Sequence, residues 1–189
     1  MRTRLKFDND ATFDLDEQAA NAFGAYATAS GWSFRAAIGA LIDGTLEGNE
    51  MPGTHDLGPG VMGAVSVAKQ WTLGDGQWFV AGSATLSAVR ASTHETGAAD
   101  DPSLTAGDLR IGAMAGRAFA TIWKPYIMGR AFGGPVAWTI AGESVVGSDT
   151  HHYQLGAGLS VATAFGLTLV VDVSALGEQS ASLGFGWRL

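Results

Sequence analysis

An alternation of apolar residues with small or polar residues, repeated every two positions, is the feature that most constrains this chain. In the C-terminal segment 182–189, Leu183, Phe185, Trp187 and Leu189 alternate with Ser, Gly and Arg. A period of two places successive side chains on opposite faces of an extended strand. The chain is therefore expected to be all-β. The same alternation recurs over 32–43, 108–115, 152–161 and 167–174.

We expect nine or ten antiparallel strands, joined by connections that alternate in length. The expected strands are 20–30, 32–43, 60–72, 77–91, 105–117, 123–133, 151–162, 166–174 and 180–189, with 2–8 as a tenth. Short turns are expected near residues 30–31, 73–76, 118–122 and 164–165. Long acidic loops are expected at 44–59, 92–104 and 134–150.

The charge content argues against an ordinary soluble domain. The 189 residues include 11 basic and 18 acidic residues, or 15%, whereas soluble chains carry roughly 25%. The net charge of −7 has the wrong sign for binding a phosphate backbone, so no nucleic-acid partner is expected. Charges are dense in 1–18, which we interpret as a charged N-terminal segment or a partial first strand and loop, followed by a barrel over 19–189.

A transmembrane helix is not expected. The longest uncharged stretch that could span a membrane, Tyr153 to Val171, contains Gln154 and many Gly, Ser and Thr residues. The first residues, Met-Arg-Thr-Arg-Leu-Lys-Phe-Asp, lack the apolar region of a secretory signal. An exported form would carry a leader in addition to this sequence.

Two arrangements fit such strands. In a soluble sandwich or lipocalin-like barrel the apolar face is the core, whereas in a membrane barrel it faces lipid and the polar face lines the lumen. Expected strands of about 10–12 residues match the ~9–11 tilted residues that cross a bilayer. The polar face consists of small residues with sparse charges, which favours an antiparallel up-and-down transmembrane β-barrel. The charges expected to face its lumen are Arg35, Asp43, Asp108, Arg110, Asp172 and Arg188.

Aromatic residues near the short turns support the membrane interpretation. Trp and Tyr concentrate where a barrel wall meets the membrane surface. The residues expected to form this girdle are Trp32, Trp71, Trp78, Trp123, Tyr126 and Trp187.

Several short motifs occur in order along residues 20–189. The most specific is Trp123-Lys124-Pro125-Tyr126, followed by Arg130 to Gly134. The others are Phe23 to Ala27, Gly76 to Val80 with Leu86-Ser87, the glycine-rich Gln154 to Ser160, and the last strand Ala181 to Leu189. Together these motifs resemble the β-domain of autotransporters, the type V secretion proteins of Gram-negative bacteria, in which the first of them is similar to a strand and loop entry.

The resemblance implies a bacterial outer-membrane location, contact with lipid and insertion by the barrel-assembly machinery. The family barrel has twelve strands, preceded by a pore-spanning helix and a passenger, so the chain is expected to be truncated at its N-terminus. Phe185, Trp187 and Leu189 would form the C-terminal assembly signal, although Leu189 stands where the family usually has Phe or Trp.

No enzymatic signature is present in the sequence. The chain has no P-loop, Gly-x-Ser-x-Gly elbow or His-Glu-x-x-His motif, and it has no cysteine. The four histidines, His55, His94, His151 and His152, are expected in solvated loops rather than in a metal site. We expect no catalytic residue, no cofactor and no metal.

The leading functional hypothesis is the translocator domain of an autotransporter, a pore through which a passenger polypeptide crosses the outer membrane. The second is a stand-alone small outer-membrane barrel whose acidic loops bind a surface partner. The third is a soluble ligand-binding β-barrel, which would need no detergent.

Overall fold

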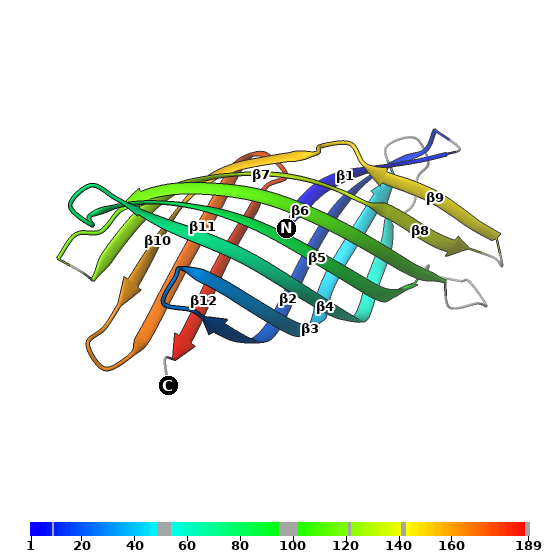
Figure 1. Ribbon diagram of the computed structural model, residues 1–189. Coiled ribbons are helices and arrows are strands. Elements are labelled where there is room, and N and C mark those ends of the chain that lie inside the picture. The colour runs from blue at the N-terminus through cyan, green and yellow to red at the C-terminus, as the bar shows by residue number, and fades with distance from the viewer. Residues whose placement is uncertain (9, 49–53, 95–101, 121, 141–142, 188–189) are drawn as a thin grey trace.

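The computed structural model is all-β, with long antiparallel strands that run obliquely along an elongated barrel (Figure 1). It describes residues 1–8, 10–48, 54–94, 102–120, 122–140 and 143–187. In these ranges no helix is long and apolar enough to span a membrane. The strands are β1 (Arg2–Phe7), β2 (Thr12–Ala27), β3 (Trp32–Gly48), β4 (Thr54–Leu73), β5 (Trp78–His94), β6 (Ser103–Arg117), β7 (Trp123–Gly133), β8 (Pro135–Ile140), β9 (Glu143–Asp149), β10 (Tyr153–Ala162), β11 (Leu167–Gly177) and β12 (Ser180–Trp187).

The twelve strands form one up-and-down sheet, in which every pairing is antiparallel. β7 and β8 lie end to end along the same side of β6, and both pair with it. On their other side, β10 pairs with β7 and β9 pairs with β8, so β9 and β10 also lie end to end. The ten expected strands correspond to β1 to β7 and β10 to β12, and β8 and β9 are additional strands.

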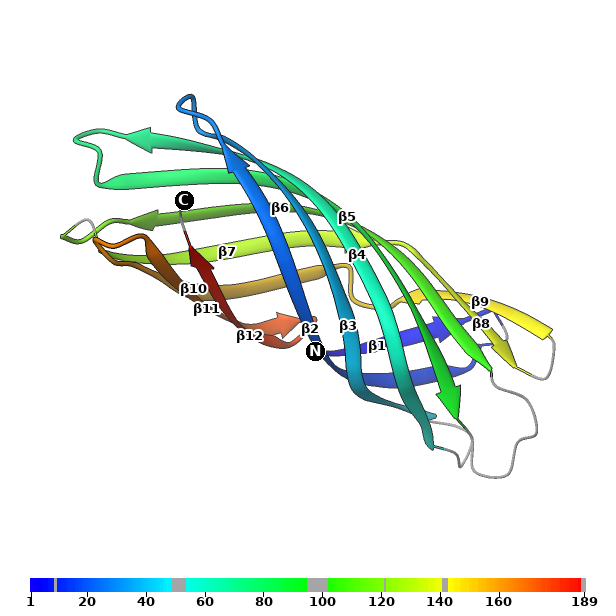
Figure 2. The same cartoon turned by 90° about the horizontal axis from the view of Figure 1, so that it is seen from below.

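The two ends of the barrel are built differently. At the long-looped end, the pairings β1–β9, β9–β8 and β8–β6 close β1 to β6, β8 and β9 into a ring. Toward the short turns, β10 continues from β9 but does not pair with β1. The hairpin of β11 and β12 lies between β10 and β1 (Figures 1 and 2). The barrel is therefore closed into a ring at one end, whereas its other end, here called the wide half, includes the β11–β12 hairpin and is only partly closed.

The expectation of a long loop over 134–150 is wrong, because β8 and β9 form a paired hairpin there. These strands are only six and seven residues long, and Gly134-Pro135 before them is typical of a turn. The loops expected at 44–59 and 92–104 are also shorter than predicted. The ladders of β3 with β4 and of β5 with β6 continue into both of them.

An apolar core fills the ring at the long-looped end. Trp138 is 1% exposed and makes an edge contact with Phe13, with ring centroids 5.1 Å apart. Its indole N–H donates to the hydroxyl of Thr93 at 3.0 Å, so this polar atom is satisfied inside the core. The remaining core residues are Leu5, Phe7, Leu15, Leu41, Leu46, Leu57, Ala91, Leu104 and Val136.

Between this core and the short turns, the large apolar side chains lie on the outside of the barrel wall instead of the inside. Ile38, Ile42 and Leu46 lie four residues apart on β3, so an unbroken strand would present them on one face. Ile38 and Ile42 are 75% and 63% exposed, whereas Leu46 is fully buried. The register of β2 with β3 shifts between these levels, opposite Leu41 and Asp43. A β-bulge of one residue flips the following side chains to the other face.

The next strand changes face at the same height. Leu57 is buried in the core, while Val61 and Val65 are exposed on the outside. The register of β4 with β5 is irregular between Leu57 and Gly60. Two neighbouring strands thus move their apolar residues from the outside to the inside of the wall together.

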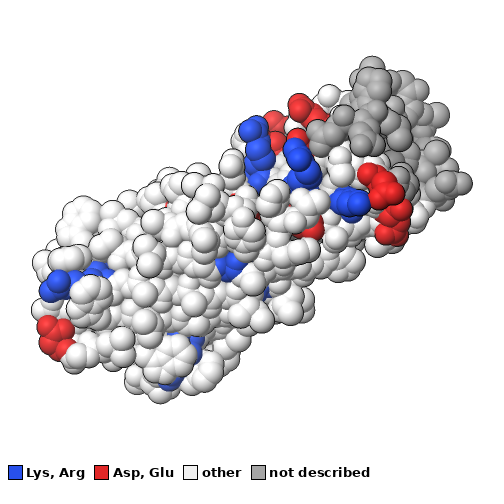
Figure 3. Space-filling model, turned by 90° about the horizontal axis from the view of Figure 1, so that it is seen from above, with Lys and Arg blue, Asp and Glu red and all other residues white. Residues whose placement is uncertain are grey.

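Residues 1–8 and 10–17 belong to the closed ring. They include β1, the first part of β2 and Asp10 between these strands, and their side chains make the ion pairs Arg2–Asp16, Arg4–Asp14 and Lys6–Asp10. The hydrogen bond to Asp14 and the charge of this carboxylate raise the pKa of Arg4. Figure 3 shows charged residues gathered toward the two ends of one face, with few between them.

A pair of truncations on β3 tests the inversion. Leu46→Ala removes a fully buried side chain and is expected to lower the free energy of unfolding by about 2–5 kcal/mol. Ile42→Ala, on the same strand but on the exposed face, is the matched control and is expected to cost clearly less. Urea unfolding followed by circular dichroism measures both. Equal losses would contradict the change of face.

Candidate functional site: the lumen

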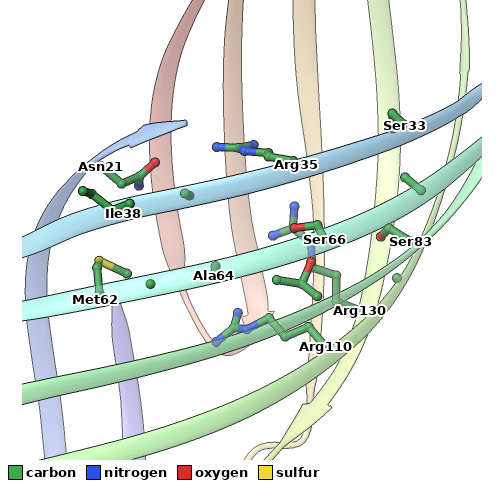
Figure 4. A pocket seen from close by; sticks show the side chains of 15 residues that line it. Asn21, Ser33, Arg35, Ile38, Met62, Ala64, Ser66, Ser83, Arg110 and Arg130 are labelled. Carbon is green, nitrogen blue, oxygen red and sulfur yellow. The ribbon is translucent and has the colours of Figure 1, made fainter. Parts of the chain in front are cut away.

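The wide half of the barrel contains a partly open cavity of about 420 Å³ into which three arginines project. Arg35 on β3, Arg110 on β6 and Arg130 on β7 point into it from three strands (Figure 4). Other lining residues, small or polar except for Met62, include Asn21, Ser33, Ala37, Met62, Gly63, Ala64, Ser66, Ala68, Ser83, Thr85 and Gly112.

An ion pair connects β6 to the tip of the β11–β12 hairpin. The guanidinium of Arg110 donates to both carboxylate oxygens of Glu178, at 2.7 and 2.8 Å, and also to Asp108. Glu178 is only 1% exposed. Because β7 and β10 separate β6 from β11 in the sheet, this contact is not between neighbouring strands. It holds the hairpin tip in place from the inside.

Amide and guanidinium groups extend this contact into a network. The amide of Gln154, also buried, donates to Glu178 at 3.2 Å and to the Ser180 hydroxyl at 2.8 Å. Its carbonyl oxygen accepts from Arg130 at 3.0 Å. The buried carboxylate therefore has several donors, as buried charges require.

A second contact lies closer to the short turns. The hydroxyl of Tyr126 donates to Asp172, which also accepts from Ser182 at 3.4 Å. The ring of Tyr126 occupies the space where a side chain at Gly158 would lie. This glycine on the neighbouring strand is what allows the tyrosine to lie flat against the wall.

The structure places the predicted lumen charges in different settings. Arg35 and Arg110 line the cavity, and Asp108 and Asp172 accept hydrogen bonds from Arg110 and Tyr126. Asp43 is exposed and outside the cavity lining, and its carboxylate accepts the backbone N–H of Gly44 at the register shift. The reason is the bulge itself, which interrupts the alternation at that residue. Arg188 lies outside the described residues.

Five of the six residues predicted to form the aromatic girdle are exposed, and the sixth, Tyr126, contacts the lumen network. Exposed indoles near the short turns are Trp32, Trp71, Trp78, Trp123 and Trp187. The Lys69 ammonium and the Arg117 guanidinium each lie 5.2 Å from an indole ring, of Trp32 and Trp78 respectively. Tyr126 differs, because its hydroxyl bonds to Asp172 in the lumen network. Of the expected C-terminal signal, Phe185 and Trp187 are exposed, and Leu189 lies outside the described residues.

The histidines are not gathered into a site. His55 was expected in a loop, but it lies on β4, with its ring edge-on to Trp138 at 4.8 Å. His94 ends β5, and His151 and His152 separate β9 from β10. Among the described residues, no group of three or more His, Asp or Glu side chains could hold a metal ion.

Sequence reasoning missed two residues that matter here. Glu178 follows Gly177, which has a φ of 75°, and a glutamate in such a turn is normally solvated. Gln154 belongs to the polar face of its strand, but the alternation of apolar and polar residues does not distinguish a buried Gln on that face from a Ser or Gly. The only signal for Glu178 was its isolation between Asp172 and Arg188 as the single charged residue.

A scan against protein-family models and a search of curated proteins find no match to this chain.

A charge-removal series tests the Arg110–Glu178 contact. Arg110→Met leaves a buried, uncompensated carboxylate and is expected to lower the free energy of unfolding by about 3–5 kcal/mol. Adding Glu178→Gln removes the stranded charge and is expected to restore more than half of the loss. Urea midpoints by circular dichroism give both values. A double variant no more stable than Arg110→Met would show that the pair is not coupled.

Proposed function

We propose that this chain is an outer-membrane β-barrel whose wide half crosses the lipid and whose lumen is closed at the long-looped end. In this proposal it acts as a stand-alone barrel that presents its acidic end to a surface partner of basic charge. The observation that carries the proposal is the inverted wall of the wide half, with apolar side chains outside and arginines inside.

The outer surface supports a lipid environment. Large apolar side chains such as Tyr26, Val65, Leu86, Ile111 and Ile127 are exposed around the wide half. A soluble monomer rarely exposes contiguous apolar patches larger than a few hundred Å². The exposed tryptophans lie near the short turns, beside basic side chains, as expected at a membrane surface.

Strand length agrees with this location. β3, β4 and β5 have 17, 20 and 17 residues, well above the ~5–6 of ordinary strands. From the register shifts to the short turns, β3 runs over Trp32 to Leu41, within the ~9–11 residues that cross a bilayer. The remaining residues of these strands build the ring, where apolar side chains face inward and charged ones outward.

The ring supports one of the two membrane hypotheses over the other. Trp138, Phe7, Phe13 and Leu46 fill its interior, so a passenger would have to displace a packed apolar core. Below it, the Arg110–Glu178 contact also occupies the lumen. This geometry favours the stand-alone barrel over the translocator. The exposed acidic residues that the barrel presents at this end include Asp8, Glu47 and Asp56.

Two adjacent residues of β4 test membrane insertion. Val65, 57% exposed, faces outward, whereas Ala64 lines the cavity. Val65→Lys is expected to weaken insertion by about 2–4 kcal/mol, the cost of lysine at the bilayer midplane. Ala64→Lys is the matched control and is expected to insert. Flotation with liposomes and the shift between boiled and unboiled samples on gels report insertion. A wild-type chain that stays soluble and monomeric without detergent would contradict the proposal.

Conductance in planar bilayers tests the closed end. The wild-type barrel is expected to show no steady ion current, because the ring interior is filled. Trp138→Ala combined with Phe13→Ala, measured on the folded fraction, is expected to raise the current. A large steady current through the wild-type protein would favour the translocator instead.

A further inference from the structure

The wide half of the barrel has a seam between β2 and β12. From Gln18 to Ala27 the only strand paired with β2 is β3, and the only strand paired with β12 over the described residues is β11. Figure 2 shows these two strands diverging from the region near the N-terminus. Every residue from Gln18 to Ala27 is exposed, on both faces of the strand. Both edges therefore present unpaired backbone donors and acceptors.

We propose that this seam is a strand-acceptor site, filled by one extended polypeptide from outside residues 1–189 that continues the path of β1. This inference goes beyond the proposed function, since it assigns a binding site to the wall. Unpaired backbone groups are costly in lipid, and an added strand satisfies them, as in β-augmentation.

The pairing of β1 at the end of the seam next to the ring indicates that the seam is one strand wide. There β1 pairs on one side with β2, through Arg2 and Asp16, and on the other with the hairpin tip, through Arg2 and Gln179. Both Arg2–Gln179 backbone hydrogen bonds are formed, at 2.8 and 3.0 Å. The amino group of Met1 donates to Glu17 at 2.5 Å. One strand thus fits between β2 and β12 where the seam begins.

The outward-facing and inward-facing residues of β2 and β12 lie at matching positions along the seam. When the register of these pairs is extended along the seam beyond Met1, the third position of an added strand lies opposite both Leu183 and Ala20, and the sixth opposite both Gly186 and Phe23. Leu183 is exposed on the lipid-facing side, with Phe185 and Trp187. Phe23 lies against the guanidinium of Arg35, which lines the cavity. A single alternating strand therefore matches both neighbours at once.

This register defines the occupant. It runs antiparallel to β2 and β12 and needs seven residues to reach Trp187. Its odd residues, counted from the end that lies next to Met1, face lipid and are apolar, and its even residues face the lumen and are small or polar. A second copy of the chain offers only the same two edges, each attached to its own sheet, so it does not fit a gap one strand wide.

The absence of cysteine allows a register-specific test. The probe is a nine-residue amidated peptide with Val or Leu at odd positions and Ser or Gly at even positions, counted from its C-terminal end. Its third position carries a Cys activated as a mixed disulfide with thionitrobenzoate. The targets are the single variants Leu183→Cys and Ala20→Cys, folded in detergent. The control is Ile111→Cys, which is exposed on the fully paired strand β6.

Both target variants are expected to react at least about tenfold faster than Ile111→Cys and than the register-shifted Phe185→Cys, since directly opposed residues approach most closely. A peptide with proline at its even positions is expected to lose this advantage. Only the folded, heat-modifiable band is scored. The two target variants are measured separately, so if one of them misfolds, the other still tests the proposal.

Three results would overturn the proposal. The first is equal reaction rates at the targets and the controls. The second is a disulfide between Ala20→Cys and Leu183→Cys in one molecule without peptide, which would show that the seam closes on itself. The third is a disulfide-linked dimer of Leu183→Cys, which would assign the seam to a second copy. The assay also runs in water, so a soluble chain would contradict the membrane proposal without deciding this one.

Discussion

A strand that alternates apolar and small residues presents its apolar side chains to one side of a sheet, and a one-residue bulge changes that side. The rest of this structure depends on that constraint. On β3 the apolar series Ile38, Ile42, Leu46 continues in the sequence, yet it passes from the outer surface to the core. One pattern thus serves two environments: an apolar interior in the ring and an apolar exterior in the wide half.

The barrel also widens between the ring and the short turns. The ring is small enough for side chains such as Trp138 to fill it, whereas the wide half has room for a cavity lined by arginines. The β11–β12 hairpin makes the difference, because it lies between β10 and β1. Its tip carries Glu178, and burial of that carboxylate is compatible with stability only because Arg110 and Gln154 pair with it. The polar lumen and the widened wall are therefore one feature.

Most of the fold was accessible from the sequence, because long period-two alternation leaves few alternatives to antiparallel strands. The short strands of 135–149 were missed, since six or seven residues after Gly-Pro resemble a turn. Asp43 was expected in the lumen from its place in the alternation, and the bulge at that residue places it on the exposed side. Tyr126 was expected in the girdle beside Trp123, but a glycine on the next strand leaves room for its ring near Asp172.

By itself, the sequence determined the strand character, the antiparallel connectivity, the sparse charge and the separation of apolar from small residues, because these follow from local spacing and composition. Only the tertiary structure decided which way each face points, that the long-looped end is closed by a core, and that β2 and β12 leave an edge unpaired. These properties depend on where bulges fall and on which strands meet after closure. Such contacts join residues far apart in the chain, and no local pattern specifies them.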